Sequence, residues 1–545
     1  MRWSGVAIAL GFAFSCSLPT LAGSVDAPPP DLAPTSEHLA TILINHEAAL
    51  GKPTAGLPDT VIEDWRYTDS GISGKEHLER SGDNYHSRIT AGPLVEEFGQ
   101  FDGKRWHRDY NGSVSPTTQL DDRTFYADYV NEDAADPKND ATVIGITTGD
   151  HPAYVVQVKV SGSLHPEWIF YDASTFLITR VERIIGGHHR IVTTFDDFRT
   201  TDGVTSPWHM HDAWDPREFD DDYVRTSMQV GVPVDSTQFA QPPSASQLPS
   251  YSTIGMRLPA KIYNDGTIVL RMNVAGRGLD LMLDTLTSED ILDEDVATQL
   301  NLPTYGHVTR LPNGDYASFY TTIPLATIGA STYKNVVFHA MPYNFQQSWD
   351  TKVVGVLGYD FLANNVVEIS YDNGGSVTIM PSVAFNAATP VAGGITYPID
   401  FDDGVPFISM PIGDDMSNNV VLTIEFTYSI LFGSYIASHT PIAPSDKATT
   451  SQADLPFADS DSFGHVISIF PVQPSHISFG SVNFQQPEVV GTDYPLRFSD
   501  DRPVDAALGF DFLRWFDVYL DYPHDRIIVK PNQFFFHVTH EHAHV

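Results

Sequence analysis

One short pattern occurs twice in the C-terminal half of this chain and constrains its fold more than any other feature. The pattern Leu-Gly-aromatic-Asp-Phe-Leu begins at Leu357 and again at Leu508. After each copy come an alternating strand-like run, a turn that contains Asp and Tyr, and a second strand-like run. A repeat of this length indicates one β-rich unit that is built twice.

The segments before the two copies also correspond. Each begins with a hairpin-like stretch, YNDGTIVLRMNVAGRG in the first and FDDGVPFISMPIGDD in the second, and then reaches an apolar run, LMLDTLTSEDIL or VVLTIEFTYSIL. We therefore predict a mainly-β fold in this half, with one lobe over residues 253–383 and a second over 395–533. Two similar lobes imply a cleft at the pseudo-twofold axis between them.

An apolar strand that enters Asp284-Thr285, followed later by an apolar-Leu-Gly segment, resembles the aspartic peptidase fold. The resemblance is to bacterial retropepsin-like proteins and covers residues 253–533. In that family each of two lobes or subunits places one Asp on a loop at the floor of the cleft. The resemblance implies an aspartic-type endopeptidase, with Asp284 and Thr285 as candidate catalytic residues.

Such chemistry needs two carboxyl groups. Two carboxylates that lie close together cannot both ionise readily, so one stays protonated near the working pH. The charged group takes a proton from a water molecule, and the neutral group donates a hydrogen bond to the carbonyl under attack. The titration belongs to the pair, so one carboxyl alone does not reproduce it.

The second lobe lacks an Asp at the corresponding place. Superposing the two apolar runs pairs Asp284 with Thr423, Thr285 with Ile424, and Leu286 with Glu425. A shift that makes Glu425 the acid loses the match between the Ile-Leu pairs downstream. We therefore interpret the second loop as degenerate and Asp284 as the remnant of a catalytic pair.

The first loop also departs from the family pattern. Leu286 stands where the family has a Gly, whose missing Cβ lets the backbone turn tightly. The family's threonine bonds across to the other lobe, a role that falls to Thr285 and that Ile424 cannot return. Gly358 and Gly509 are predicted to permit close packing against these loops. The neighbouring acids of the repeated pattern, Asp360 and Asp511, are interpreted as helix-starting or turn-capping residues.

The N-terminal half, over residues 34–235, shows one amphipathic helix pattern at Thr35–Leu50 and then short alternating strands separated by turn residues. The run YDASTFLITRVERI and the segment after it resemble periplasmic lipoprotein-carrier domains of the LolA type. That resemblance implies a helix that caps a strongly curved antiparallel sheet, with an apolar cavity between them. Residues 236–252, rich in Pro, Ser and Gln, are predicted to be a linker.

The first 22 residues have the layout of a secretory signal peptide, with Arg2, an apolar run and small residues near Ala22. Cleavage there removes Cys16, the only cysteine, so the exported chain has no disulfide, as suits a bacterial periplasm. Lipid attachment at Cys16 is the alternative. No later segment is apolar over the roughly 18 residues that a membrane-spanning helix needs, so the mature chain is predicted to have none.

The composition and net charge restrict the kinds of molecule that the chain is expected to bind. Apolar residues make up 42% of the chain and charged residues 18%, as in folded globular proteins. The 31 Lys and Arg against 69 Asp and Glu leave a net charge of −38. This charge repels phosphate backbones, which argues against nucleic acid as a partner.

The C-terminal tail, residues 534–545, is rich in histidine. Its imidazoles at His537, His540, His542 and His544 are weak candidates for binding a metal ion, and a frayed polar tail is the alternative.

Together these features predict an exported, degenerate aspartic-peptidase-like protein that is inactive as a single chain, binds polypeptide in its cleft and has no cofactor. Strand addition, which uses backbone groups, is the expected mode of binding. Two alternatives stay open. One is an active endopeptidase that pairs Asp284 of two chains. The other is a carrier of lipid or another apolar ligand in the N-terminal domain. The oligomeric state is not determined by the sequence.

Overall fold

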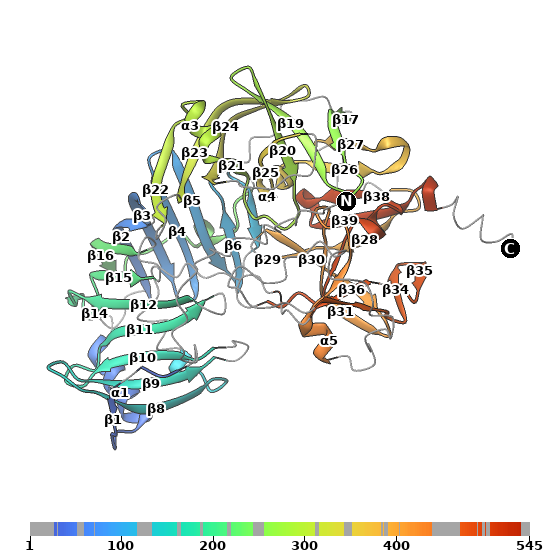
Figure 1. The fold of residues 1–545 in the computed structure, drawn as a ribbon. Coiled ribbons are helices and arrows are strands. Elements are labelled where there is room, and N and C mark those ends of the chain that lie inside the picture. The colour runs from blue at the N-terminus through green and yellow to red at the C-terminus, as the bar shows by residue number, and fades with distance from the viewer. Residues whose placement is uncertain are drawn as a thin grey trace.

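The chain is mainly β, as predicted, and combines one long curved sheet with two smaller lobes (Figure 1). The computed structural model describes residues 27–29, 31–51, 59–69, 71–116, 133–160, 165–185, 189–214, 220–243, 255–310, 316–342, 351–382, 385, 391–402, 404–438, 469–487, 489–492, 496 and 502–535. The predicted signal peptide with Cys16 and the four histidines of the tail lie outside these residues. None of the helices in the described ranges is long and apolar enough to cross a membrane.

The N-terminal half forms a 14-stranded sheet in which every neighbouring pair is antiparallel. Its strands are β1 (Leu32–Ala33), β2 (Thr60–Asp69), β3 (Ile72–Ser81), β4 (Asn84–Ala91), β5 (Leu94–Phe101), β6 (Lys104–Arg108), β7 (Val114–Pro116), β8 (Asp140–Thr147), β9 (Ala153–Lys159), β10 (Glu167–Asp172), β11 (Ile178–Ile185), β12 (His189–Asp196), β15 (His209–Ala213) and β16 (Asp221–Val230). A separate hairpin is formed by β13 (Arg199–Thr201) and β14 (Val204–Ser206).

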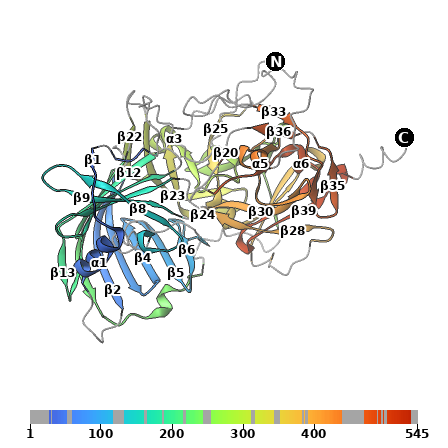
Figure 2. The ribbon, with the colours of Figure 1, turned by 90° about the horizontal axis from the view of Figure 1, so that it is seen from below.

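Helix α1 (Leu39–Leu50) lies inside the curve of this sheet (Figure 2). The helix begins four residues after the predicted start at Thr35. The hydroxyl of Thr35 instead accepts a hydrogen bond from the amide of Glu37 at 3.1 Å, which is a local turn that competes with helix formation. Ile42 is fully buried among aromatic and aliphatic side chains of the sheet, so packing against the sheet stabilises the helix.

The two C-terminal lobes repeat one strand arrangement. The first lobe contains β18 (Ala260–Ile262), β19 (Ile268–Val274), β20 (Arg277–Leu283), β21 (Ile291–Asp293), α3 (Glu294–Gln299), β22 (Thr304–Arg310), β23 (Tyr316–Ile328), β24 (Ser331–Met341), β25 (Val353–Leu357) and α4 (Tyr359–Ala363). The second contains β29 (Asp400–Asp402), β30 (Val405–Ile412), β31 (Asp415–Leu422), β32 (Ile430–Leu431), α5 (Gly433–Ser438), β33 (Ile469–Val472), β34 (His476–Phe479), β35 (Val482–Gln485), β36 (Val489–Thr492), β37 (Ala506–Leu508) and α6 (Phe510–Leu513).

A parallel strand pair lies at the same place in each lobe. Strand β20 pairs with β25, with Leu283 opposite Leu357, and β31 pairs with β37, with Leu422 opposite Leu508. Each pair joins the apolar run before a loop to the first residue of the repeated Leu-Gly pattern. The repeat in the sequence therefore corresponds to a repeat in the fold.

A six-stranded sheet joins the lobes. Its order is β17, β27, β26, β38, β39, β28, and the central contact is the antiparallel pairing of β26 from the first lobe with β38 from the second. Its elements are β17 (Met256–Leu258), β26 (Val366–Ser370), β27 (Ser376–Met380), β28 (Ile395–Pro398), β38 (Phe516–Asp521) and β39 (Arg526–Pro531), with the short 3-10 turns η3 (Asp372–Gly374) and η6 (Tyr522–His524) between strands.

The N-terminal domain docks on the first lobe through the turn between β6 and β7. The side chain of Asn111 bonds both backbone groups of Val337, at 2.8 Å to its nitrogen and 3.1 Å to its oxygen. The ring of Tyr110 meets that of Tyr320 edge-on at 4.9 Å. The segment predicted as a linker begins with the turn η2 (Ser236–Phe239). Its Phe239 is fully buried, so the first residues of this segment pack against the domain.

Candidate active site

The loops that begin at Asp284 and Thr423 occupy equivalent positions in the two lobes. The amide of Asp284 donates to the carbonyl of Leu357 at 3.1 Å, and the amide of Thr423 donates to the carbonyl of Leu508 at 3.0 Å. In both lobes, therefore, the parallel strand pair continues for one hydrogen bond into the loop. Asp284 is 1% exposed and Thr423 is fully buried.

The second carboxyl at this place comes from Glu425, two residues beyond Thr423. Its Oε1 accepts hydrogen bonds from the amides of Thr285 and Leu286, both at 3.0 Å. The amide of Leu286 also donates to Oδ1 of Asp284 at 2.7 Å. One N–H group thus lies between two carboxyl groups that belong to different lobes.

The environment of Glu425 favours its neutral form. Burial, the charge of Asp284 and a hydrogen bond with the Asp284 carboxyl raise the pKa of Glu425 well above its ordinary value. This is the behaviour of two acids that share one site, where one proton is retained between them. Glu425 keeps partial exposure, so the pair is not sealed from solvent.

This contact was not predicted from the sequence. Alignment by position puts Glu425 opposite Leu286 and leaves Thr423 as the partner of Asp284. The longer Glu side chain spans the two-residue offset, and its Oε1 reaches the amides of Thr285 and Leu286 beside Asp284. The acid in the second loop was the available signal, but only the conformation of the loop shows where its carboxyl lies.

Thr285 links the lobes from one side only. Its Oγ lies 3.0 Å from the carbonyl of Leu422 and 3.0 Å from Oε2 of Glu425. Ile424, at the equivalent position of the second lobe, is buried and has no hydroxyl to return this bond. The amide and hydroxyl of Thr285 together hold the Glu425 carboxyl beside Asp284.

Leu286 is accommodated in place of the expected Gly because its side chain enters the second lobe. It is 2% exposed and packs in an apolar cluster whose other members all belong to that lobe. These are Val405, Phe407, Val421, Phe426, Ile430, Phe432, Val490, Leu496, Val504 and Ala507. The departure from the family pattern thus creates an interlobe apolar contact next to the acid pair.

Gly358 and Gly509 lie directly behind the two loops. A Cβ on Gly358 meets the carbonyl oxygens of Glu289 at 2.5 Å and Thr287 at 2.6 Å. A Cβ on Gly509 meets the carbonyl oxygen of Phe426 at 2.5 Å. Real Cβ atoms do not approach backbone oxygens this closely, so both positions require Gly for the loops to pack as they do.

Two tyrosines of the six-stranded sheet also lie near the pair. Tyr371 and Tyr522 follow β26 and β38, at matching places of the repeat, and their hydroxyl oxygens are buried without a hydrogen-bond partner among the residues the structure describes. Burial and the nearby charge of Glu425 raise the pKa of both. The Asp-Tyr turn of the repeat was the sequence signal for these residues.

Asp360 and Asp511 lie in the first turns of α4 and α6, as expected of helix-starting residues, and they also bind the loops. Asp511 accepts hydrogen bonds from the amide of Ser429 at 3.0 Å and from its hydroxyl at 2.6 Å. Asp360 accepts from the amide of Asp290 at 3.2 Å. Both acids therefore fasten the ends of the loops to the Leu-Gly segments.

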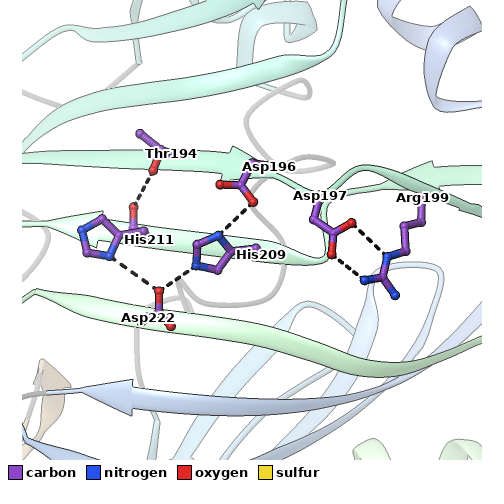
Figure 3. Close-up of polar contacts among 7 residues, drawn as sticks. All are labelled: Thr194, Asp196, Asp197, Arg199, His209, His211 and Asp222. Carbon is purple, nitrogen blue, oxygen red and sulfur yellow. Dashed lines mark hydrogen bonds and ion pairs between the residues drawn. The ribbon is translucent and has the colours of Figure 1, made fainter.

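The histidines of the N-terminal sheet form ion pairs. His209 lies between Asp196 and Asp222, at 2.9 and 2.7 Å, and His211 is 3.8 Å from the same Asp222 (Figure 3). Partial burial lowers the pKa of His209, but the two carboxylates outweigh it and the pKa is raised. Within the described part of the chain, no group of three or more His, Cys, Asp or Glu side chains is arranged to hold a metal ion.

Comparison with known proteins gives structural likenesses alone. No protein-family model and no curated protein sequence matches the chain. A LolA superfamily protein from Nitrosomonas europaea covers 38% of this chain and 99% of its own, with 11% identity and a TM-score of 0.29. A putative outer membrane lipoprotein-sorting protein domain from Vibrio parahaemolyticus covers 37% of this chain and 94% of its own, with 9% identity and a TM-score of 0.28.

A third solved structure, an aspartic proteinase from Irpex lacteus, covers 52% of this chain and 98% of its own, with 12% identity and a TM-score of 0.31. Similarities at this level carry no argument about activity.

Proposed function

We propose that residues 255–535 act as an aspartic-type endopeptidase at acid pH, with Asp284 and Glu425 as its two carboxyls. One observation carries the proposal: the amide of Leu286 donates hydrogen bonds to both carboxyl groups, to Asp284 at 2.7 Å and to Glu425 at 3.0 Å. The raised pKa of Glu425, caused by burial and by the charge of Asp284, supports a pair with one proton. Such a pair combines a base and an acid at one point.

In the proposed reaction Asp284 is charged and Glu425 is neutral. Asp284 takes a proton from a water molecule while the water oxygen bonds to the carbonyl carbon of a peptide, and Glu425 gives its proton to the carbonyl oxygen. The tetrahedral intermediate then breaks its C–N bond: the leaving nitrogen takes the proton held by Asp284, and one hydroxyl of the intermediate returns its proton to Glu425, which leaves an amine and a carboxylic acid. The backbone amides of Thr285 and Leu286 orient Glu425 through this cycle.

The proposal needs only one chain. Pairing Asp284 of one molecule with Asp284 of another requires the lobes to separate, yet Asp284 is 1% exposed and Leu286 is buried in the opposite lobe. Separation exposes that apolar side chain, which costs about 2 kcal/mol for Leu alone. The contact between Asp284 and Glu425 within one chain therefore supports a monomeric site.

A carrier function for the N-terminal sheet, export and a periplasmic location stay predictions. Helix α1 lies inside the curve of the sheet, with Ile42 fully buried and the ring of His46 bonded to the carbonyl of Phe176 at 2.7 Å. No contact of the described residues favours a bound apolar ligand over this helix, so the peptidase is the function we propose.

The test is cleavage of a reduced, unfolded protein by the purified full-length chain across pH 3 to 7. Activity should rise in acid, and both Asp284→Asn and Glu425→Gln should reduce it at least a hundredfold, while Glu47→Gln, on the exposed side of α1, should not. Cleavage that survives Glu425→Gln but not Asp284→Asn would show that another group completes the pair. Cleavage that survives both substitutions, or its absence from the unaltered chain, rules the proposal out.

A further inference from the structure

A second group of buried acids lies behind the loop of Asp284, where the N-terminal domain meets the first lobe. It consists of Asp290 at the end of the loop, Asp360 at the start of α4, and Asp109 in the turn between β6 and β7. Asp290 is 2% exposed and Asp360 is 7% exposed. The mechanism proposed above uses none of these three carboxyls.

The second lobe shows what this arrangement requires. There the hydroxyl of Ser429 accepts from the amide of Gly509 at 2.8 Å and donates to Asp511 at 2.6 Å. In the first lobe Asp290 takes the place of Ser429, and its Oδ1 accepts from the amide of Gly358 at 2.8 Å. For Asp290 to donate to Asp360 as Ser429 donates to Asp511, its carboxyl has to carry a proton.

Asp109 adds a third acid from the other domain. Its Oδ1 accepts from the amide of Ser113 at 2.9 Å, the backbone of Asn111 also bonds its carboxyl, and its Oδ2 is buried. The carboxyl of Asp360 lies within hydrogen-bonding reach of Asp109. Two carboxylates cannot bond each other without a proton, so this contact also requires one.

The groups that face the three acids do not supply a compensating cation to them. Glu289 bonds the hydroxyl of Tyr320 at 2.9 Å and pairs with His339 at 3.0 Å. Tyr359 bonds Ser115 and lies near Asp109, Asp360 and Asp525. Other charged groups on this side, among the described residues, are Glu96, which acts on Tyr320, and His107, which pairs with Glu96 at 2.8 Å. Arg108, which precedes Asp109, pairs with Glu97 at 3.1 Å.

We propose that Asp109, Asp290 and Asp360 share protons and form an acid-dependent lock that holds the N-terminal domain against the loop of Asp284. Three acids from three separate segments meet here, and the contact between the carboxyls of Asp109 and Asp360 is a hydrogen bond only while one of them carries a proton. Loss of these protons places like charges in a buried site and favours separation of the domain from the lobe. This inference goes beyond the peptidase proposal and does not depend on it.

The pKa shifts of the three acids show how docking of the N-terminal domain depends on pH. Burial raises the pKa of Asp360 to about 6, although the hydrogen bond with Asp109 favours its charged form. Burial and the charge of Asp360 raise the pKa of Asp109 and of Asp290 well above the ordinary value. The docked state therefore binds more protons than the separated state, so docking is strongest in acid and weakens as the pH rises from about 4 through 6.

The magnitude is bounded by the shift of Asp360. Burial raises its pKa from the ordinary 3.8 to about 6, and because part of this burial comes from its own lobe, ionisation of Asp360 favours separation by at most about a hundredfold. The amide of Val337 reports on docking because it donates to Asn111 of the N-terminal domain at 2.8 Å. Its protection from hydrogen exchange falls whenever that contact opens.

The experiment measures amide exchange of Val337 in the full-length protein at pH 4.5 and 7.5, corrected for the intrinsic effect of pH on exchange. Protection should fall at the higher pH in the unaltered chain, by up to about a hundredfold. It should stay constant in Asp109→Asn/Asp360→Asn, whose amides imitate the protonated acids. Asp511→Asn, the same change in the second lobe, should retain the fall.

Two outcomes overturn the lock. One is equal protection of Val337 at both pH values in the unaltered chain. The other is a fall of the same size in Asp109→Asn/Asp360→Asn, which assigns the pH dependence to other groups. His339→Gln identifies one of these groups, since a fall that disappears with His339 belongs to its pair with Glu289. None of these exchange measurements requires catalytic activity, so they test the proposed lock independently of the proposed peptidase activity.

Discussion

Replacing Glu425 by Gln tests the acid pair through stability as well as through activity. The Gln side chain has nearly the same shape as a protonated Glu but cannot ionise. Burial and the charge of Asp284 raise the pKa of Glu425 in the folded chain above the value of 4.5 that it has when unpaired. The folded state therefore retains a proton that the unfolded state releases first.

The sign and size of the effect follow from this difference. Below pH 4.5 Glu425 is protonated in both states and its contribution to stability is fully present. As the pH rises toward the folded pKa, this contribution is lost at up to about 1.4 kcal/mol per pH unit. The Glu425→Gln variant has no ionisable group at this position and loses no stability from it in this range. The free energy of unfolding of the variant relative to that of the unaltered chain should therefore rise with pH by that slope.

Urea unfolding at intervals between pH 4 and 7 measures the difference in the free energy of unfolding directly. Glu47→Gln, on the exposed side of α1, is the control and should change the slope by less than about 0.3 kcal/mol per unit, as expected for a surface residue. Parallel pH profiles for the unaltered chain and Glu425→Gln would mean that Glu425 is ionised in the folded state. The argument for a proton shared with Asp284 would then be wrong.

Three further substitutions test the contacts around the pair by urea unfolding. Thr285→Val should lower the free energy of unfolding by about 1–3 kcal/mol because it removes the donor to Leu422, while Thr285→Ser should restore most of it; equal loss in both contradicts the role of the hydroxyl. Leu286→Ala should cost about 2–5 kcal/mol through the cavity left in the second lobe, and a cost below about 1 kcal/mol would place the side chain outside that cluster. Gly358→Ala should cost about 1–3 kcal/mol or prevent folding, since its Cβ meets the carbonyl of Glu289, and an unchanged stability contradicts that packing.

Much of the fold could be predicted from the sequence because β-strands and turns have characteristic residue patterns within short segments. Alternating apolar residues indicated the strands of both halves, and the repeated Leu-Gly pattern indicated two equivalent units. The parallel pairing of Leu283 with Leu357 and of Leu422 with Leu508 lies where these patterns begin and end. The start of α1 was less well predicted, because the Thr35 hydroxyl bonds a nearby amide in a turn as readily as it caps a helix.

The acid pair was a matter of tertiary structure. Asp284 and Thr423 stand at equivalent places, as spacing alone suggests, yet the carboxyl beside Asp284 belongs to Glu425. Spacing records the position of a residue along a strand and not the distance its side chain spans. The loop conformation and the amides of the first lobe decide which oxygen lies at the site.

The sequence by itself determined a mainly-β chain with a duplicated C-terminal half, since both follow from patterns within short segments. Only the tertiary structure decided that Asp109 of the N-terminal domain meets Asp360 and that Leu286 enters the second lobe. These contacts join residues far apart in the chain, and their energies depend on burial. A side chain is buried when segments distant in the sequence pack over it and displace water. The residues around that side chain in the sequence do not show which segments these are.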